Sequence, residues 1–126
     1  MSYRTPLGRA RGLGSAKEGT AHWWAQRVTA IALVPLAVWF VVVVIQLAGS
    51  DRAALVEWMR HPVPATVWVL LLIAIFYHGA LGLQVVIEDY VENEALRFGL
   101  LIIMKLAAII LAALGIFAVL KLSFAA

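Results

Sequence analysis

Three long apolar runs constrain the fold of this chain more than any other feature. They cover residues 28–48, 65–87 and 98–120, which is 21, 23 and 23 residues. At about 1.5 Å per residue a helical run of this length reaches about 32–35 Å, enough to cross a hydrocarbon core about 30 Å thick. The runs lack the period-two alternation of barrel strands, and helices are the other structure that can span lipid. The sequence therefore predicts an all-α integral membrane protein with three transmembrane helices.

The composition agrees with this fold class and excludes several others. Of the 126 residues, 64% are hydrophobic and 13% are charged, and the mean hydropathy is +0.97. A single small domain in water cannot hide so much apolar surface, which excludes a soluble enzyme, a disordered protein and a nucleic-acid-binding module. The chain has no cysteine, so disulfides, thiolate nucleophiles and cysteine-ligated iron–sulfur or zinc sites are excluded within it.

The polar segments divide the chain into an arm and a membrane domain. Residues 1–26 are predicted to form a cytoplasmic N-terminal arm, and residues 27–126 the three-helix domain. Because no apolar stretch directly follows the basic residues of the arm, we expect it not to be a cleaved signal peptide. The first loop predicts a short amphipathic helix over 51–59, ended by HPVP, and the second loop, 88–97, is acidic.

The distribution of Lys and Arg predicts the orientation in the membrane. Six basic residues lie on the N-terminal side and three on the opposite side, which are Arg4, Arg9, Arg11, Lys17, Arg27 and Arg97 against Arg52, Arg60 and Lys121. The N-terminus is therefore predicted to be cytoplasmic and the C-terminus external. Trp23 and Trp24 would anchor one interface and Trp58 the other.

One imidazole lies inside the second apolar run. His78 precedes Ile87 by nine residues, about 13–14 Å along a helix, and polar groups at such depth are by default functional. It could bond a neighbouring helix or serve as an axial ligand of haem iron. Gly79 and Gly82 beside it would let a flat macrocycle approach the backbone, or would form a small-residue packing face.

Asp89 and Tyr90 end the same predicted helix. Asp89 follows His78 by eleven residues, which returns to within about 20° of the same face, three turns on. The pair would give a carboxylate and a phenol at the cytoplasmic boundary, above the imidazole. The alternative is ordinary interfacial chemistry, since tyrosine is enriched there.

These residues resemble a known family. The pattern His78-x10-Asp89-Tyr90 on a second transmembrane helix is similar to that of the succinate dehydrogenase hydrophobic membrane anchor subunits. The stretch RVTAI at 27–31 resembles the Arg-x-Thr-Ala-Ile of that family, and SAKEGTAHWWAQR at 15–27 is similar to the arm of its alphaproteobacterial and mitochondrial branch. Length, three spans and topology match as well.

The resemblance implies a role for each matching position. His78 would be an axial ligand of haem b, shared with a partner subunit. Tyr90 would hydrogen-bond a carbonyl oxygen of ubiquinone, and Asp89 would neighbour the quinone and assist proton delivery. The partners implied are a three-helix cytochrome b556-type membrane subunit, an iron–sulfur subunit and a flavoprotein subunit, in a bacterial inner membrane or, as the alternative, a mitochondrial one.

The implied function is that of a membrane anchor in a succinate:ubiquinone oxidoreductase, complex II of the respiratory chain and the tricarboxylic acid cycle. The chain itself carries no flavin or nicotinamide fingerprint and no cysteine cluster, so we expect it not to oxidise succinate. A fumarate reductase-type anchor and a non-redox membrane scaffold are the alternatives.

Four further polar residues are assigned by position. Arg27 is expected to be a positively charged interfacial anchor, with a haem-propionate or quinone contact as the alternative. Lys105 is expected to extend toward the cytoplasmic headgroups, with a propionate partner as the alternative. His22 and His61 are expected to be solvated.

Overall fold

The computed structural model describes residues 5–10, 12 and 19–125, and the elements in this part of the chain are helices. They are α1 (Pro6–Ala10), α2 (Gly19–Leu47), α3 (Arg52–Arg60), α4 (Pro62–Tyr90) and α5 (Glu94–Ser123). Helices α2, α4 and α5 are long and apolar enough to cross a membrane. The predicted all-α class with three candidate spans is therefore confirmed.

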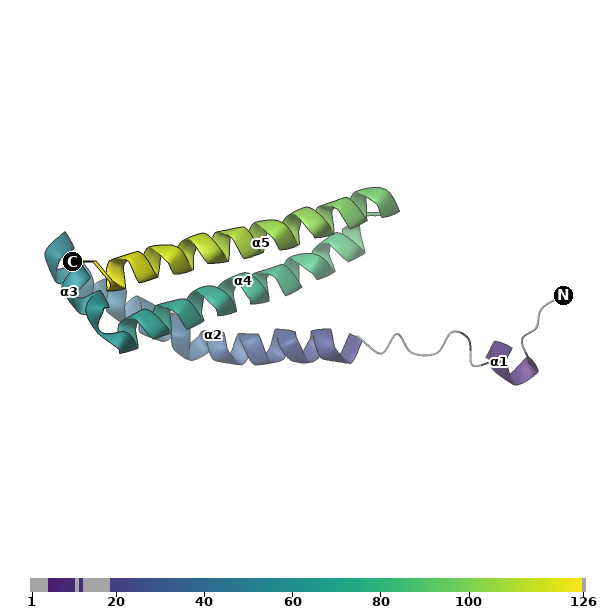
Figure 1. The fold of residues 1–126 in the computed structure, drawn as a ribbon. Helices are drawn as coiled ribbons and strands as arrows, with labels where there is room; N and C mark the ends of the chain where they lie inside the picture. The colour runs from purple at the N-terminus through teal and green to yellow at the C-terminus, as the bar shows by residue number, and fades with distance from the viewer. Residues whose placement is uncertain (1–4, 11, 13–18, 126) are drawn as a thin grey trace.

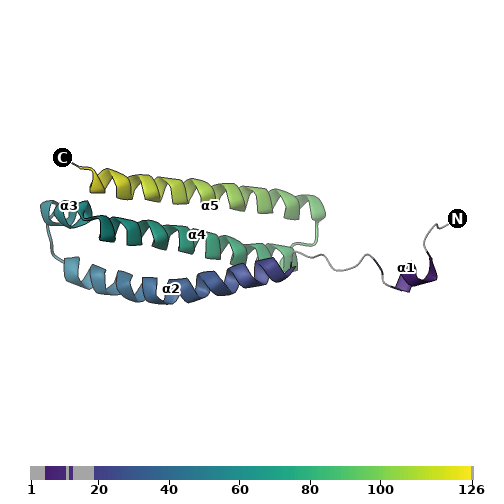
Figure 2. The same ribbon diagram turned by 60° about the horizontal axis from the view of Figure 1, so that its bottom comes forward.

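The three long helices lie side by side, with α4 between α2 and α5 (Figures 1 and 2). The start of α2 and the short connection between α4 and α5 lie at one end of this bundle. Helix α3 and the C-terminus lie at the other end, where α3 packs on both α4 and α5. The last turns of α4, which carry Asp89 and Tyr90, therefore share an end with the first turns of α2.

The helices extend beyond the apolar runs at several of their ends. Helices α2, α4 and α5 have 29, 29 and 30 residues, which is about 44 Å at 1.5 Å per residue and matches a bilayer with its headgroup regions. Residues 19–26, expected in the polar arm, are helical, and the expected 88–97 loop shrinks to 91–93. The hydropathy of a sequence marks only the part of a helix that lies in hydrocarbon. The backbone hydrogen bonds of that helix continue through the headgroup region.

The side chain of Asn93 explains why the second loop is so short. It accepts a hydrogen bond from the backbone N–H of Leu96 at 2.9 Å, which caps α5 and starts it at Glu94. The acidic residues of the expected loop consequently belong to helix ends, apart from Glu92.

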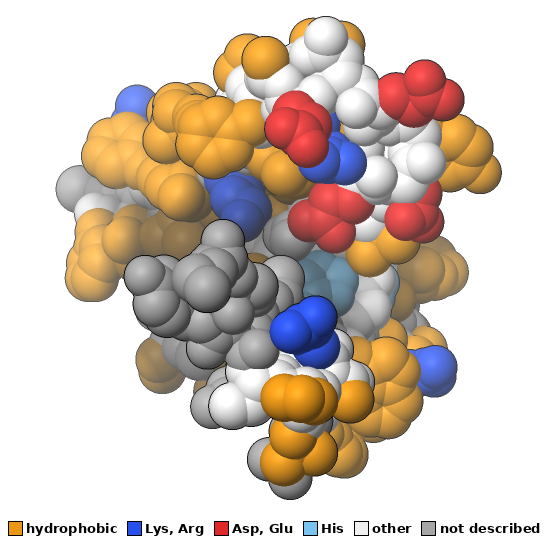
Figure 3. Space-filling model, turned by 90° about the vertical axis from the view of Figure 1, so that its right-hand side faces the viewer, with side chains coloured by type: hydrophobic (Ala, Val, Ile, Leu, Met, Phe, Trp, Pro, Cys, Tyr) orange, Lys and Arg blue, Asp and Glu red, His pale blue; other side chains and the backbone are white. Residues whose placement is uncertain are grey.

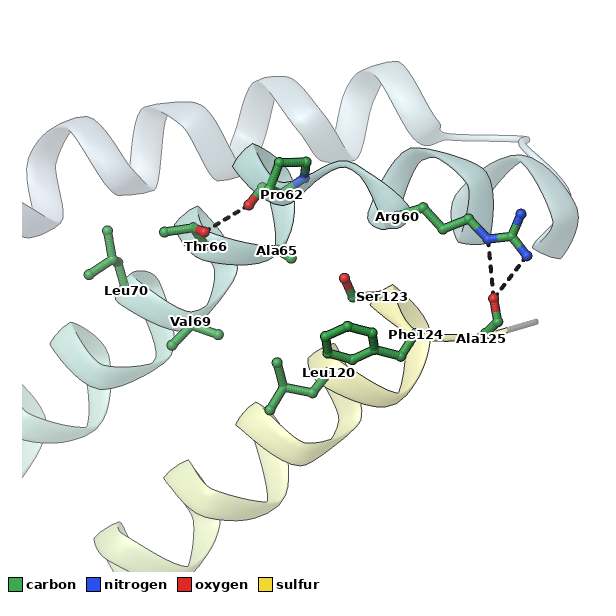
Figure 4. Close-up of a pocket in the computed structure, with 10 residues that line it drawn as sticks. All are labelled: Arg60, Pro62, Ala65, Thr66, Val69, Leu70, Leu120, Ser123, Phe124 and Ala125. Carbon is green, nitrogen blue, oxygen red and sulfur yellow. Dashed lines mark hydrogen bonds between the residues drawn. The ribbon is translucent and has the colours of Figure 1, made fainter.

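The predicted amphipathic helix is α3, and it closes one end of the bundle. Asp51 caps it by accepting a hydrogen bond from the backbone N–H of Ala54 at 2.8 Å, and Met59 is buried on its inner face. Arg60 donates from Nη2 and Nε to the carbonyl oxygen of Ala125, at 2.8 and 3.1 Å (Figure 4). These bonds join α3 to the residues that follow α5, beside a groove of about 660 Å³ between α4 and α5.

Aromatic side chains join α2, α3 and α4 near the same end. Trp39 of α2 stacks on Trp58 of α3 at 6.2 Å between ring centroids and meets the edge of Trp68 of α4 at 5.7 Å. Phe40 also meets Trp68 edge to face, at 5.5 Å. Such pairs add about 0.5–1.5 kcal/mol each beyond their area. The indole of Trp58, expected to anchor an interface, is half-buried and packs between helices at this end of the bundle.

Gly115 permits close approach of α5 to α4, and a larger residue there is predicted to separate them. A Cβ at this position would lie 3.1 Å from both Cδ atoms of Leu72. We expect Gly115→Leu to destabilise the protein by about 1–3 kcal/mol, the usual cost of overpacking. Thermal unfolding of the detergent-solubilised protein measures the effect. Gly99→Leu on the same helix is the matched control, because a Cβ there meets nothing within 4 Å; equal losses from both variants would contradict the prediction.

Most of the apolar surface of the three long helices is not covered by the chain itself. Seven apolar side chains are buried among the described residues, while Ile31, Ile109 and Phe117 are 71%, 66% and 65% exposed. Water cannot be the solvent for such faces. They require lipid or other membrane helices around them.

Candidate functional site

His78 lies near the middle of α4 and faces α2. It is 12 residues before the end of α4, about 18 Å along the axis, and it is half-buried. Its Nδ1 lies 2.9 Å from the Oγ1 of Thr29 on α2. No hydrogen bond among the described residues involves its Nε2. One ring nitrogen is therefore held by the fold, and the other is free for a ligand.

The two glycines beside His78 play different parts. A Cβ at Gly82 would lie 3.7 Å from Nε2 of Gln26, so this glycine lies in the contact between α4 and α2. A Cβ at Gly79 would meet nothing within 4 Å. The packing interpretation thus fits Gly82, whereas Gly79 makes no such contact with another helix.

Two polar side chains on α2 continue this contact toward the end of the bundle. Nε2 of His22 and Oε1 of Gln26 are buried and have no hydrogen-bond partner within the described residues. The expectation that His22 is solvated is therefore wrong for that atom, because α2 begins before it and turns it inward. Buried polar atoms without partners are costly. Both atoms are already covered by this chain, in the contact between α2 and α4.

Asp89 and Tyr90 lie at the exposed end of α4. Tyr90 is 82% exposed, and neither side chain forms a hydrogen bond or an ion pair with the described residues. Acidic side chains gather on this end of the molecule (Figure 3), where Glu88, Asp89, Glu92 and Glu94 are all exposed. Within the part of the chain that the structure describes, the carboxylate and the phenol therefore have no partner.

Arg27 and Lys105 lie apart from the imidazole. The guanidinium of Arg27 sits 5.2 Å from the ring centroid of Trp23, a cation–π contact, and Trp23 meets Trp24 edge to face at 5.2 Å. This arrangement fits the interfacial anchor expected for Arg27. Lys105 is exposed and lines a groove of about 530 Å³ between α4 and α5, opposite Gln84. Neither side chain contacts His78, Asp89 or Tyr90 through a hydrogen bond or ion pair in the described part of the chain.

Thr29 is the site residue that sequence reasoning did not single out. It belongs to the RVTAI stretch, but its partner lies 49 residues away. No spacing rule within one helix connects such positions, since their contact depends on how α2 and α4 pack.

Comparison with known proteins identifies the family. The family model described as "Succinate dehydrogenase/Fumarate reductase transmembrane subunit" matches residues 1–120. A succinate dehydrogenase hydrophobic membrane anchor subunit of Rickettsia bellii (strain RML369-C) is 36% identical over 108 residues, 86% of each chain. The subunit of that name in Paracoccus denitrificans is 39% identical over 93 residues, 74% of this chain and 72% of its own length.

A more distant relative and the solved structures complete the comparison. The succinate dehydrogenase membrane anchor subunit of Reclinomonas americana is 29% identical over 96 residues, 74% of this chain and 80% of its own. No solved structure matches significantly. The family match covers α2, α4 and α5 up to residue 120, together with His78, Asp89 and Tyr90, and the chain belongs to the succinate dehydrogenase membrane anchor subunits.

Proposed function

We propose that this chain anchors a succinate:ubiquinone oxidoreductase in the membrane, co-ligates haem b through His78 and contributes Tyr90 and Asp89 to the quinone site. The observation that carries the proposal is the state of His78. Its Nδ1 is bonded to Thr29 while its Nε2 has no partner among the described residues, in a helix able to span the membrane. A histidine that only linked two helices would need the bond between its Nδ1 and Thr29, and a free Nε2 would add nothing to that role.

The residues around His78 fit a haem shared with another subunit. An added Cβ at Gly79, directly after His78, would meet nothing within 4 Å outside its chain neighbours. A single imidazole with one nitrogen held by Thr29 suits an iron whose other ligands would come from a macrocycle and a partner. Bound haem would supply one-electron redox chemistry within the membrane. His78 would hold and orient the iron.

Tyr90 and Asp89 would serve the quinone at the membrane surface. Reduction of ubiquinone to the quinol takes up two electrons and two protons. The phenol of Tyr90 can donate a hydrogen bond to a quinone carbonyl, and the carboxylate of Asp89 can pass protons from water. Because both side chains are exposed and unpaired with the described residues, partner subunits would complete this site.

The proposed partners are an iron–sulfur subunit and a flavoprotein subunit on the cytoplasmic face, and a cytochrome b556-type subunit in the membrane. The uncovered apolar faces of α2 and α5 suit both lipid and a second three-helix subunit. Relatives in Rickettsia and Paracoccus favour the bacterial inner membrane. The matching relatives are named for succinate dehydrogenase, which favours that direction over fumarate reduction.

We expect the N-terminus to be cytoplasmic and the C-terminus external. The physical reason is the excess of Lys and Arg on the N-terminal side, six against three. A C-terminal alkaline phosphatase fusion, active only outside the cytoplasm, should be active, and a C-terminal green fluorescent protein fusion should be dark. The reverse pattern would put Asp89 and Tyr90 on the side away from a cytoplasmic electron donor.

Co-purification of the tagged full-length chain from its native membrane tests the function. We expect a flavoprotein, an iron–sulfur protein, a second membrane subunit and one haem b per complex. Succinate-dependent ubiquinone reduction should accompany the purified complex. A chain recovered with membrane partners but without flavin, iron or haem would favour the scaffold alternative.

A further inference from the structure

The hydroxyl of Thr29 lies between α2 and α4, and its oxygen is within hydrogen-bond distance of three polar atoms. Its Oγ1 is 2.7 Å from the carbonyl oxygen of Ala25, 3.1 Å from that of Gln26 and 2.9 Å from Nδ1 of His78. The first two contacts lie within α2, and the third crosses to α4. Thr29 and His78 are both partly buried.

Counting hydrogens assigns the direction of the bond to His78. A threonine hydroxyl has one hydrogen, and carbonyl oxygens only accept. At 2.7 Å from the oxygen of Ala25, the hydroxyl must point its hydrogen at that carbonyl, since two oxygens this close without a hydrogen repel each other. A lone pair of Oγ1 then faces Nδ1, so the imidazole donates. A neutral imidazole with hydrogen on Nδ1 carries its free lone pair on Nε2.

We propose that Thr29 is a positioning residue that fixes the Nδ1–H form of His78 and presents Nε2 as the iron-ligating atom. This inference rests on the proposed haem ligation and adds to it a residue on the neighbouring helix. Metal-binding histidines usually donate their other N–H to a fixed acceptor, which holds the ring and raises its basicity. In this chain that acceptor is a neutral hydroxyl, itself anchored on the α2 backbone.

The electronic consequence has a definite sign. An acceptor on Nδ1–H makes the imidazole a stronger donor to the metal, and a stronger donor favours ferric over ferrous iron. Loss of the Thr29 hydroxyl should therefore raise the midpoint potential of the haem. Loss of the bond also frees the ring to rotate, which changes the low-spin ferric EPR signal.

The test uses three variants in the assembled complex. Thr29→Val keeps the branched shape and removes the hydroxyl, whereas Thr29→Ser keeps the hydroxyl. Thr66→Val is the matched control, because Thr66 also bonds the carbonyl oxygen four residues before it, at 2.7 Å, but it lies on α4 twelve residues from His78. Haem content, redox titration of the haem and EPR spectra of the ferric form are measured for each.

We expect Thr29→Val to raise the midpoint potential, shift the EPR signal and weaken haem binding on the order of 10–100-fold. Thr29→Ser and Thr66→Val should resemble the wild type in all three measurements. Failure of Thr29→Val to retain haem, with recovery in Thr29→Ser, also supports the proposal, because valine preserves the packing shape.

Two outcomes overturn the inference, and they are distinct from failure of haem ligation itself. One is a Thr29→Val complex whose potential and EPR signal match the wild type while His78→Ala abolishes the low-spin spectrum. The other is equal damage in Thr29→Val and Thr29→Ser, which would make the shape of the side chain the cause. If His78→Ala leaves the low-spin haem spectrum unchanged, both the assignment of His78 as a haem ligand and this inference are wrong.

Discussion

Replacing His78 with alanine is expected to abolish the low-spin haem spectrum of the assembled membrane subunits. His78 offers the one imidazole near the middle of a long helix in this chain, because His22 lies in the first turn of α2 and His61 lies between α3 and α4. On the proposed haem ligation, a partner subunit would supply the other protein ligand. Without His78 the haem would lose a protein ligand or would not be retained. Absorbance and EPR spectra of the purified complex, with haem quantified as the pyridine haemochrome, measure the change.

The control and the contradicting result for His78 are both accessible. His61→Ala should leave the spectrum unaltered, since His61 is exposed and precedes the first residue of α4, whereas Tyr90 is the last residue of that helix. Imidazole added to the His78→Ala complex should restore part of the low-spin signal, because the Thr29 hydroxyl remains to accept its N–H. The isolated chain should bind haem poorly. An unchanged low-spin spectrum together with unchanged haem content would remove His78 from the coordination of iron.

The helices could be predicted from hydropathy, but the contacts between them could not. Continuous apolar runs require membrane spans, and Asp51 before an amphipathic stretch is a local capping signal for α3. The Asn93 cap is equally local, yet the acidic residues around it made the segment look like a loop. Boundaries were displaced because side-chain polarity changes at the edge of the hydrocarbon, several residues before a helix must end.

Contacts between helices depend on how each helix is rotated about its own axis and on its register along the neighbouring helix. A single sequence does not indicate either quantity. His78, Asp89 and Tyr90 are related by helical periodicity and could be placed on one helix in advance. The bond from His78 to Thr29 and the stacking of Trp58 on Trp39 join positions on different helices. Trp58 was expected at the interface because tryptophan is enriched there, and the sequence did not indicate that its ring also packs against α2.

Replacing Tyr90 with phenylalanine is expected to slow quinone reduction sharply without affecting assembly. The hydroxyl is the only group removed, the side chain is 82% exposed, and the described residues give it no hydrogen bond. The substitution therefore removes no hydrogen bond within the described part of the fold. A neutral hydrogen bond to the quinone contributes about 0.5–1.5 kcal/mol, but a headgroup misplaced by about 1 Å can lose on the order of 100-fold in rate.

Two activities measured on one preparation separate this role from an anchoring role for Tyr90. Succinate oxidation by a soluble artificial acceptor should stay near normal in Tyr90→Phe, along with haem content, while ubiquinone reduction falls. Asp89→Asn should show the same pattern more weakly, because it keeps the size of the side chain and loses the charge that can carry a proton. An interfacial anchor would behave differently: assembly and both activities would decline together. Such a parallel decline, or undiminished quinone reduction, would exclude Tyr90 from the quinone site.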